Sequence, residues 1–392
     1  MSHFLPQTAW TKRQGLADLT HALGSETLRF VGGAVRDTLL GAEVHDVDCA
    51  TTHTPSAVID LCKQAGIRVV PTGIDHGTVT AVLEDGPVEI TTLRKDVATD
   101  GRRATIAFAS EWSEDAARRD FTINALYAHP ETLAISDYFD GLADLDARRV
   151  RFIGTAQQRI AEDHLRILRY YRFQARFGAQ LDARAEEACA AMAETLKGLS
   201  RERIADELLK LLALPNPSAT IARMRARGVL PVILPETCPA HIKALERLIR
   251  AEDTQGVARD PVRRLAALLP PSPDVAETCA ARLRLSKAQR ARLVNASERQ
   301  AADSASPRAL AYRLGATFAT DRLLLLDKDA RMIADFTPPT FPLKGGQIVA
   351  RGVGAGPEVA RILQSVERRW VEEGFPDSAR IEALLDEELR ER

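Results

Sequence analysis

The sequence predicts an α+β protein in which a small mixed β-sheet comes first and a long all-helical part follows. Three observations lead to this prediction: short apolar segments near the N-terminus, helical periodicity after about residue 155, and proline-rich interruptions of that helical part. Apolar segments bounded by turn residues favour short strands over long helices. The expected strands are residues 28–31, 46–50, 68–70, 78–83, 88–93 and 106–109, with helices at 34–40 and 55–65.

The second part of the chain is expected to consist of helices alone. Apolar residues there recur three or four positions apart, as in Ile362, Leu363, Val366 and Trp370, and this spacing places them on one helix face. Proline cannot continue a helix, so the proline-containing stretches mark boundaries between helices. These stretches lie at 215–217, 270–273 and 338–339. We expect four parts, with the bounds 1–140, 141–206, 207–300 and 301–392.

Composition limits the class of protein. The 392 residues are 45% hydrophobic and 27% charged, which is typical of a globular protein, and the net charge of −1 gives no general attraction to nucleic acid. The five cysteines are widely scattered, which argues against a zinc finger or a disulfide framework and favours a reducing cytoplasm. No apolar run approaches the ~20 residues of a membrane helix. We therefore expect a cytoplasmic protein without a membrane partner.

The segment from residue 30 to 41 has the pattern of a phosphate-binding turn. An apolar strand ends at Val31, and Gly32 and Gly33 let the backbone turn tightly and approach a ligand where a Cβ atom would collide. A helix expected to begin near Ala34 directs its free N–H groups at such a ligand. Arg36, one turn into that helix, can add charge-assisted hydrogen bonds to phosphate oxygens.

Two carboxylates follow within the next strand. Asp46 and Asp48 are two residues apart and therefore point to one face, while Val47 points to the other. Paired carboxylates are the oxygen ligands that Mg²⁺ prefers. Either half of this arrangement is common by itself, since a Gly-Gly pair is usually only a turn and Asp-x-Asp is often a solvated strand end. Their conjunction favours a nucleotide site.

A third carboxylate is expected on a neighbouring hairpin. The pattern of residues 73–94 predicts a hairpin that turns at 84–87, and its second strand alternates Val88, Glu89 and Ile90. Glu89 thus points away from its apolar neighbours. An additional carboxylate can act as a base or metal ligand in deprotonating a hydroxyl, although a surface glutamate on a half-buried strand is the simpler interpretation.

Three motifs together resemble a known family. The first is Gly-Gly-x-Val-Arg-Asp followed by Asp-x-Asp, the second is Arg-Arg-Asp-Phe-Thr-Ile-Asn-Ala at 118–125, and the third is Glu-Asp-x-x-Arg at 162–166. With these motifs the chain resembles the class II nucleotidyltransferases, the family of tRNA CCA-adding enzymes and bacterial poly(A) polymerases. The likeness covers residues 28 to about 210 strongly and 341–370 weakly. It implies a nucleotidyltransferase head domain at 1–140, a helical neck that selects the base at 141–206, a body at 207–300 and a tRNA-binding tail at 301–392.

The resemblance also implies an activity and a set of site residues. The activity is template-independent addition of C, C and A to the 3′ end of tRNA from CTP and ATP, with no protein partner expected. It makes Asp46, Asp48 and Glu89 catalytic and assigns two Mg²⁺ ions to Asp46 and Asp48. The implied nucleotide-binding residues are Gly32, Gly33, Arg36, Asp37, Arg119, Asp120, Asn124, Asp163, Arg166, Arg169 and Arg172.

Base selection follows from hydrogen-bond chemistry. Cytosine and adenine both present an amino donor beside a ring-nitrogen acceptor, whereas uracil and guanine present the reverse. One carboxylate and one guanidinium complement the first pair and reject the second. Asp163 and Arg166, three apart on an expected helix, are assigned these two roles, with Arg169 and Arg172 supporting the site or the triphosphate. A charged helix face with weak ion pairs is the simpler alternative.

Two later segments have features that suit RNA phosphates. Residues 282–292 hold five basic residues and no acidic one, and they include Arg284, Lys287 and Arg290. A solvated helix face is an equally simple interpretation. Gly354 and Gly356 lie in a glycine-rich turn that leads into a proline at the expected start of a helix, and the resemblance implies that it grips the tRNA backbone.

Other functions stay open at this stage. The nearest alternative is a poly(A) polymerase, disfavoured because residues 73–82 lack the basic run with Phe associated with that branch. An enzyme that adds only CC or only A belongs to the same family. A non-catalytic RNA-binding protein conflicts with the intact carboxylates, and a metal phosphohydrolase, suggested by His45-Asp46, lacks further histidine ligands. Residues 94–103 are expected to form a polar loop, and Ser200 to cap a helix.

Overall fold

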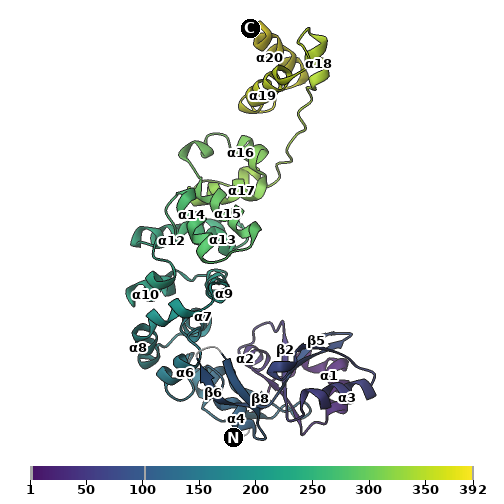
Figure 1. Cartoon of the computed structure of the whole chain (residues 1–392), viewed down its shortest axis with the longest axis vertical. Helices are drawn as coiled ribbons and strands as arrows, with labels where there is room; N and C mark the ends of the chain where they lie inside the picture. The colour runs from purple at the N-terminus through teal and green to yellow at the C-terminus, as the bar shows by residue number, and fades with distance from the viewer. Residues whose placement is uncertain (1–2, 101–102, 391–392) are drawn as a thin grey trace. The chain divides into compact units, whose positions relative to one another are not determined.

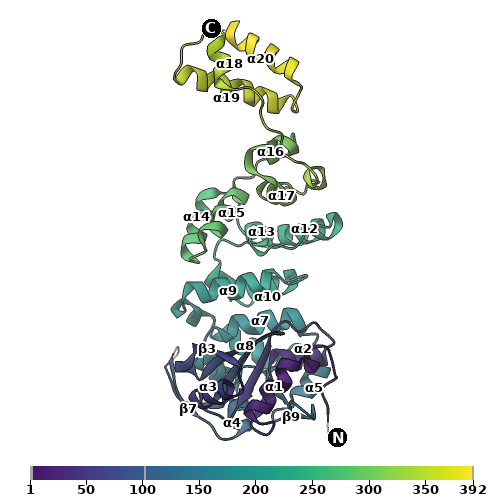
Figure 2. The same ribbon diagram turned by 90° about the vertical axis from the view of Figure 1, so that its right-hand side faces the viewer.

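The computed structural model describes residues 3–100 and 103–390. The chain forms two compact units, and Figures 1 and 2 colour their elements by residue number. Unit 1 comprises Met1–Glu207 with Arg223–Ile233, and unit 2 comprises Leu208–Ala222 with Leu234–Arg392. All strands lie in unit 1, and the rest of the described chain is helical, so the predicted α+β class is confirmed.

A seven-stranded mixed sheet organises unit 1. Its strand order is β3-β4-β5-β2-β1-β8-β9, and β2 and β5 pair in parallel while the other neighbours are antiparallel. The strands are β1 Leu28–Val31, β2 Val47–Thr51, β3 Arg68–Gly73, β4 Thr78–Leu83, β5 Gly86–Thr92, β8 Leu126–Ala128 and β9 Ile135–Asp137.

Alternating burial explains why these segments pair as they do. In β5, Val88 and Ile90 are buried whereas Glu89 is exposed, which confirms the predicted alternation. The hairpin of β4 and β5 closes with Leu83 opposite Gly86, so its turn lies at the predicted position. A period of two fixes which face each residue occupies, and a shift of one residue would expose the apolar set.

The polar segment 94–103 was predicted as a loop, and this prediction is wrong for its described residues, whereas the strand predicted at 106–109 is largely present. This part of the chain contains β6 Arg94–Asp100 and β7 Arg103–Phe108, which pair antiparallel as a separate two-stranded sheet. Residues 101 and 102 of the expected loop lie outside the described residues. Polar residues dominate positions 94–103 in the sequence, so the apolar alternation by which a strand is recognised is missing there.

Helices surround the sheet and continue beyond it in unit 1. They are α1 Gln14–Leu23, α2 Gly33–Leu39, α3 Pro55–Gln64, α4 Trp112–Ala117, α5 Gly141–Asp146, α6 Ala156–Glu162, α7 Arg166–Phe177, α8 Ala183–Ala191, α9 Arg201–Leu212, α10 Ser218–Ala226 and α11 Leu230–Ile233, and α9 and α10 extend into unit 2. The predicted Ser200 cap is present, since Ser200 Oγ accepts from the Arg203 N–H at 3.4 Å.

Aromatic packing attaches α7 to two segments of the chain, one before β8 and one after β9. Phe121 lies 4.9 Å from Phe152 and 5.1 Å from Phe173 between ring centroids, and Phe152 stacks on Tyr170 at 5.8 Å. Such offset and tilted pairs are favourable beyond their buried area. They fix one face of α7 against the residues that carry the Arg118–Arg119 pair.

Unit 2 is built from helices alone. They are α12 Pro239–Gln255, α13 Pro261–Ala267, α14 Pro273–Arg282, α15 Lys287–Ser297, α16 Pro307–Leu314, α17 Ala316–Leu325, α18 Gly345–Ala350, α19 Pro357–Glu372 and α20 Ser378–Arg390. Proline occupies the first position of five of these helices, where its missing N–H costs no hydrogen bond. No helix in the described part of the chain has the length and apolarity to cross a bilayer.

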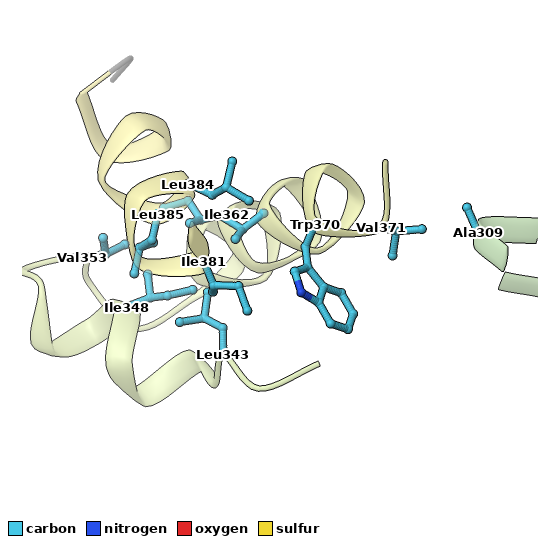
Figure 3. Close-up of a cluster of buried hydrophobic side chains, with 11 residues drawn as sticks. Ala309, Leu343, Ile348, Val353, Ile362, Trp370, Val371, Ile381, Leu384 and Leu385 are labelled. Carbon is cyan, nitrogen blue, oxygen red and sulfur yellow. The ribbon is translucent and has the colours of Figure 1, made fainter. Parts of the chain in front are cut away.

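The last three helices share a hydrophobic cluster, drawn in Figure 3. Ile362, Val366 and Trp370 of α19 are buried in the same cluster as Leu384 and Leu385 of α20, as the predicted periodicity requires. The Trp370 indole N–H donates to the Pro376 carbonyl at 2.8 Å, so the buried ring has its polar atom satisfied.

A second feature of unit 2 is a buried ion cluster. Glu252 has no exposed surface and accepts from Arg263 Nη2 and from Arg264 Nη2, each at 2.7 Å. Arg263 also reaches Asp321 at 3.1 Å, and Arg264 donates to the Leu212 carbonyl at 2.8 Å. Removing one member of such a buried set leaves charges without compensation.

Glu252→Gln is therefore expected to lower the free energy of unfolding by about 3–5 kcal/mol, because Arg263 and Arg264 lose their carboxylate in a buried site. Urea denaturation measures the effect. Asp329→Asn, which breaks the exposed pair of Asp329 with Arg331, is the control and should leave the midpoint unchanged. Equal midpoints for the two variants would contradict the importance of the cluster.

Candidate functional site

The strand register collects the predicted carboxylates on one face of the sheet. Asp48 of β2 lies directly opposite Glu89 of β5 and directly opposite Val31 of β1. Residues opposite each other in register point to the same face. Asp46 immediately precedes β2, two residues before Asp48, and is exposed. The three predicted catalytic residues are therefore neighbours in space.

These carboxylates repel one another. Burial, followed by the negative charges of Glu89 and Asp46, raises the pKa of Asp48 to about 6, while Arg119 acts in the opposite direction. A carboxylate beside two others ionises at a free-energy cost unless a cation is near. The site thus has the electrostatic character of one that accepts a positive ion.

The donor set suits an open metal site rather than a closed one. Among residues 3–100 and 103–390, no three His, Cys, Asp or Glu side chains form a preformed metal cage. Mg²⁺ is normally held by one or two carboxylates and takes its other oxygens from water and substrate phosphates. Asp46 and Asp48, with Glu89 opposite, fit that pattern.

The glycine turn has the predicted geometry. Gly32 adopts φ 71°, a conformation that glycine tolerates best, and it directly precedes α2, which begins at Gly33. A Cβ atom on Gly32 would lie 3.5 Å from Arg119 Nη1, so the turn approaches this guanidinium closely. The structure thereby brings together the turn and the second arginine of the Arg118–Arg119 pair.

Arg36 has different surroundings from those expected. It is only 5% exposed, and its Nε donates to Asp37 at 2.8 Å while Nη1 donates to Asn124 Oδ1. Its guanidinium lies over the Phe177 ring at 4.4 Å. Although a Cβ on Gly33 would lie 3.8 Å from Arg36 Nη2, the side chain is held beneath the turn by protein groups.

A continuous polar chain runs from Arg36 to α7. Asn124 receives a hydrogen bond from Arg36 and donates Nδ2–H to Asp120 Oδ1 at 2.9 Å. Asp120 Oδ2 in turn accepts from Arg169 Nε and Nη2 at 2.9 and 2.7 Å. Burial alone would raise the pKa of Asp120, but Arg169 and Asn124 lower it to about 2. Asp37 makes a second link to α7 through Arg176 at 3.2 Å.

The predicted base-reading pair is arranged differently from the expectation. We expected Asp163 and Arg166 on one continuous helix, but α6 ends at Glu162 and α7 begins at Arg166. Asp163 adopts an extended conformation with φ −150°, and its Oδ1 accepts from the Leu165 N–H at 3.1 Å. Aspartate favours such turns because its side chain competes for backbone N–H groups.

Each member of that pair has its own protein partner. Asp163 Oδ2 accepts from Arg203 Nη2 at 2.7 Å, and Arg203 belongs to α9. Arg166 Nη1 donates to Glu162 at 2.7 Å, and its Nη2 donates to the Arg118 carbonyl at 3.0 Å. The side chains are thus held in position from several directions. The bond between the two residues is a backbone one, since the Arg166 N–H donates to the Asp163 carbonyl at 3.0 Å.

The other two predicted site arginines of α7, Arg169 and Arg172, support the structure. Arg172 Nε donates to the buried Glu207 at 2.6 Å, and Arg169 lies 3.5 Å from the same carboxylate in addition to its bonds with Asp120. Both side chains lie over the Phe173 ring, at 4.7 and 5.3 Å. Of the alternatives considered for Arg169 and Arg172, these contacts favour holding the site together.

The basic segment 282–292 in unit 2 has acidic partners from outside the segment. Glu236 pairs with Arg282 at 2.6 Å, Glu277 pairs with Arg290, and Asp260 pairs with Arg292 at 2.6 Å. These acids come from distant parts of the sequence or from the preceding helix. The predicted residues Arg284, Lys287 and Arg290 are nevertheless exposed.

The glycine-rich turn of the tail has the predicted local form. Gly356 adopts φ 154°, and Pro357 follows as the first residue of α19, whose N-terminus carries no side-chain cap. Gly354 is exposed, and a Cβ at either glycine would meet open space. The first N–H groups of α19 are therefore suited to an anion.

Sequence reasoning missed three residues that position the site. Asp115 of α4 and Tyr127 of β8 both contact Arg119, and Arg203 contacts Asp163. Asp115 carried one usable signal, since it precedes Arg118 and Arg119 by three and four residues, the spacing of helical ion pairs. Tyr127 and Arg203 gave none, because their contacts depend on tertiary packing.

Comparison with known proteins gives consistent matches. A family described as Poly A polymerase head domain matches residues 28–151, and one described as probable RNA and SrmB-binding site of polymerase A matches 178–240. The mitochondrial CCA tRNA nucleotidyltransferase 1 of Mus musculus is 36% identical over 390 residues, covering 92% of this chain and 87% of that protein. A CCA-adding enzyme of Levilactobacillus brevis is 41% identical over 236 residues, covering 59% of this chain and 57% of that protein.

Solved structures agree with these matches. The crystal structure of a Bacillus stearothermophilus CCA-adding enzyme in complex with CTP has a TM-score of 0.78 at 26% identity and covers 97% of this chain and 99% of that one. A Thermotoga maritima CCA-adding enzyme complexed with tRNA has a TM-score of 0.72 at 22% identity, covering 96% of this chain and 94% of that one. The second likeness, at its lower identity, supports the fold alone.

The raised pKa of Asp48 predicts how stability depends on pH without metal. The native state retains the Asp48 proton up to about pH 6, whereas the unfolded state releases it near pH 4. The contribution of Asp48 to the free energy of unfolding therefore decreases as the pH rises from about 4 to about 6. In EDTA at pH 7.5, Asp48→Asn should therefore raise the free energy of unfolding by about 1–2 kcal/mol, allowing for partial exposure. Thermal unfolding at pH 4.5 and pH 7.5 measures this.

Glu84→Gln, in the exposed turn between β4 and β5, is the control and should give no such pH-dependent difference. An Asp48→Asn protein no more stable than the unaltered chain at pH 7.5 would contradict the proposed repulsion among the carboxylates.

Proposed function

Because this chain belongs to the CCA tRNA nucleotidyltransferase family, we propose that it adds C, C and A to the 3′ end of tRNA at the carboxylate face of the unit 1 sheet. The enzyme uses CTP and ATP. In each step the 3′-hydroxyl oxygen forms a bond to the α-phosphorus. The bond between this phosphorus and the oxygen that bridges to the β-phosphate breaks, and pyrophosphate leaves. The observation that carries this assignment is the register that sets Asp48 opposite Glu89, beside the Gly32 turn and Arg119.

Metal binding is assigned to two of the carboxylates. The reaction in this family uses divalent metal ions. We assign Mg²⁺ and two ions to Asp46 and Asp48, because both are oxygen donors at one strand end and because burial and, after it, the neighbouring carboxylates raise the pKa of Asp48. Such ions supply Lewis-acid activation of the 3′-hydroxyl and neutralise phosphate charge. We assign to Glu89 the role of accepting the hydroxyl proton or of binding the ions, because the register sets it opposite Asp48.

Triphosphate binding is assigned to the turn and to Arg119. Gly32 and Gly33 offer backbone N–H groups at the start of α2, and Arg119 Nη1 points toward the same turn. Arg36 acts beneath the turn as a positioning residue, because its donors are already directed at Asp37 and Asn124. Asp120 and Asn124 connect this region to α7.

Base selection is assigned to Asp163 and Arg166. A carboxylate has about four acceptor positions, so Asp163 can receive an amino group while it keeps Arg203 and the Leu165 N–H. Arg166 uses three of its five N–H donors in the contacts described. The remaining two donors suit the ring nitrogen and carbonyl of cytosine, or the ring nitrogen of adenine.

Binding of tRNA outside the catalytic centre is assigned to the body and tail. We retain the proposed division into head 1–140, neck 141–206, body 207–300 and tail 301–392. Lys287 and Arg284 are the exposed basic residues proposed to contact phosphates, together with the turn at Gly354 and Gly356. Arg290 already pairs with Glu277, so a phosphate would compete with that carboxylate for it.

The compartment is proposed from the cysteines. All five are free thiols, and four are buried, which suits a reducing environment such as the cytoplasm. The mitochondrial location in the names of the mammalian relatives belongs to those proteins.

The proposed activity predicts a defined pattern of tRNA extension. With tRNA that ends before CCA, CTP alone should add two residues, ATP alone none, and both together three, while UTP and GTP should add none. Sequencing gels resolve each step. An extension that stops after CC, or ATP addition only to tRNA ending in CC, would indicate a partial enzyme. Long tails from ATP alone would indicate a poly(A) polymerase, and no extension an RNA-binding protein.

Base selection by Asp163 predicts a change in nucleotide preference. Asp163→Ala removes the acceptor for the amino group of C and A, and one charge-assisted hydrogen bond is worth about 1.5–3 kcal/mol, or roughly ten- to a hundredfold in discrimination. The ratio of UTP to CTP incorporation should rise accordingly in single-nucleotide extension. Glu187→Ala, an exposed change on α8, is the control. An unchanged ratio in folded Asp163→Ala protein would remove Asp163 from base reading.

A further inference from the structure

We propose that the hydroxyl of Tyr127 is a positioning group that, together with Asp115, aims Arg119 at the triphosphate. This inference rests on the proposed function of Arg119. Tyr127 lies on β8 directly opposite Val31 of β1, and Val31 lies directly opposite Asp48 of β2. Asp48, Val31 and Tyr127 therefore form a row across three strands, with the metal-site carboxylate at one end and the tyrosine at the other.

The tyrosine hydroxyl makes two hydrogen bonds of opposite sense. It donates to Asp115 Oδ2 at 2.6 Å and accepts from Arg119 Nε at 3.0 Å. Burial raises the pKa of Tyr127 above its ordinary value, so the hydroxyl keeps the proton that it donates. With its donor used by Asp115, the oxygen lone pairs are directed at Arg119.

Asp115 holds the other side of the same guanidinium. It is 1% exposed, and its Oδ2 also accepts from Arg119 Nη2 at 3.2 Å. Its Oδ1 accepts from Arg118 Nε at 2.8 Å and from the Arg94 backbone N–H at 3.4 Å. Although burial acts to raise it, the pKa of Asp115 is lowered by Arg119 and Arg118, so the carboxylate stays charged.

These contacts leave one nitrogen of Arg119 directed at the glycine turn. Nε is bound to Tyr127 and Nη2 to Asp115, whereas Nη1 is the atom 3.5 Å from the position of a Cβ on Gly32. The ring of Tyr127 also lies 5.3 Å from the guanidinium carbon, and Trp112 packs against that ring at 6.0 Å. Two hydrogen bonds and a stacked ring thus restrict the side chain before a nucleotide arrives, which lowers the entropy lost on binding.

The structure distinguishes the hydroxyl from the ring. Tyr127→Phe removes both hydrogen bonds of the hydroxyl but keeps the aromatic contact with Arg119 and the packing against Trp112. The triphosphate is common to CTP and ATP, so loss of orientation should weaken both nucleotides equally. Neither the choice of base nor the binding of tRNA depends on Arg119 in this arrangement.

A double-mutant cycle on the full-length enzyme tests the inference. Tyr127→Phe should raise the KM for CTP and for ATP by the same factor, about three- to tenfold for one lost net hydrogen bond, with the KM for tRNA unchanged. In an Arg119→Ala background the same change should have no further effect, because Tyr127 acts through Arg119. Tyr138→Phe, whose ring contacts Tyr127 at 6.0 Å, is the matched control and should leave both KM values unchanged.

The outcomes distinguish the positioning role of Tyr127 from the triphosphate-binding role of Arg119. Effects of Tyr127→Phe and Arg119→Ala that add together would show that the tyrosine acts independently, and would overturn the positioning role alone. An unequal effect on CTP and ATP, or a changed KM for tRNA, would also overturn it. If Arg119→Ala left the nucleotide KM unchanged, the triphosphate role of Arg119 would fail, and the inference would fail with it.

Discussion

The parallel pairing of β2 with β5 is the constraint on which the grouping of carboxylates at the candidate site depends. A parallel pair needs a crossover, and here α3 and the β3–β4 hairpin segment provide it between Thr51 and Gly86. Because the pairing aligns Asp48 with Glu89, two segments some 40 residues apart place their acids side by side. Antiparallel β1 then adds the glycine turn at the same level of the sheet. A slip of one residue in β2 would turn Asp48 away from all of these groups.

Positive and negative groups are distributed unequally around this face. The carboxylates near Asp48 repel one another. In contrast, each of two arginines in unit 1 is paired with an acid, Arg119 with Asp115 and Arg169 with Asp120. The repulsion is a local cost in stability, and such costs are tolerated where a ligand removes them. The paired arginines do not add to this cost. At this face, the described electrostatic cost therefore lies with Asp48 and its neighbouring carboxylates.

The sequence was informative where structure is local. The Gly32 turn, the Asp-x-Asp strand, the hairpin with Glu89 and the Ser200 cap each depend on neighbouring residues, and their positions are confirmed. The three-residue strand β8 is too short to show alternation. The partners of Asp163, Arg119 and Arg282 come from distant segments, so nothing near them in sequence indicates them. Asp163 itself was misplaced because helical spacing continued across a turn that its own side chain stabilises.

The buried ion cluster in unit 2 has a consequence for handling and for catalysis. Ions in solution screen exposed charges over about 10 Å at 0.1 M salt, but they screen buried pairs far less. Glu252 and Arg264 have no exposed surface. Salt strong enough to detach RNA phosphates from surface lysines and arginines therefore leaves this cluster intact. The tRNA contacts proposed for the helical part could therefore be broken by salt while the buried framework of that part stays folded.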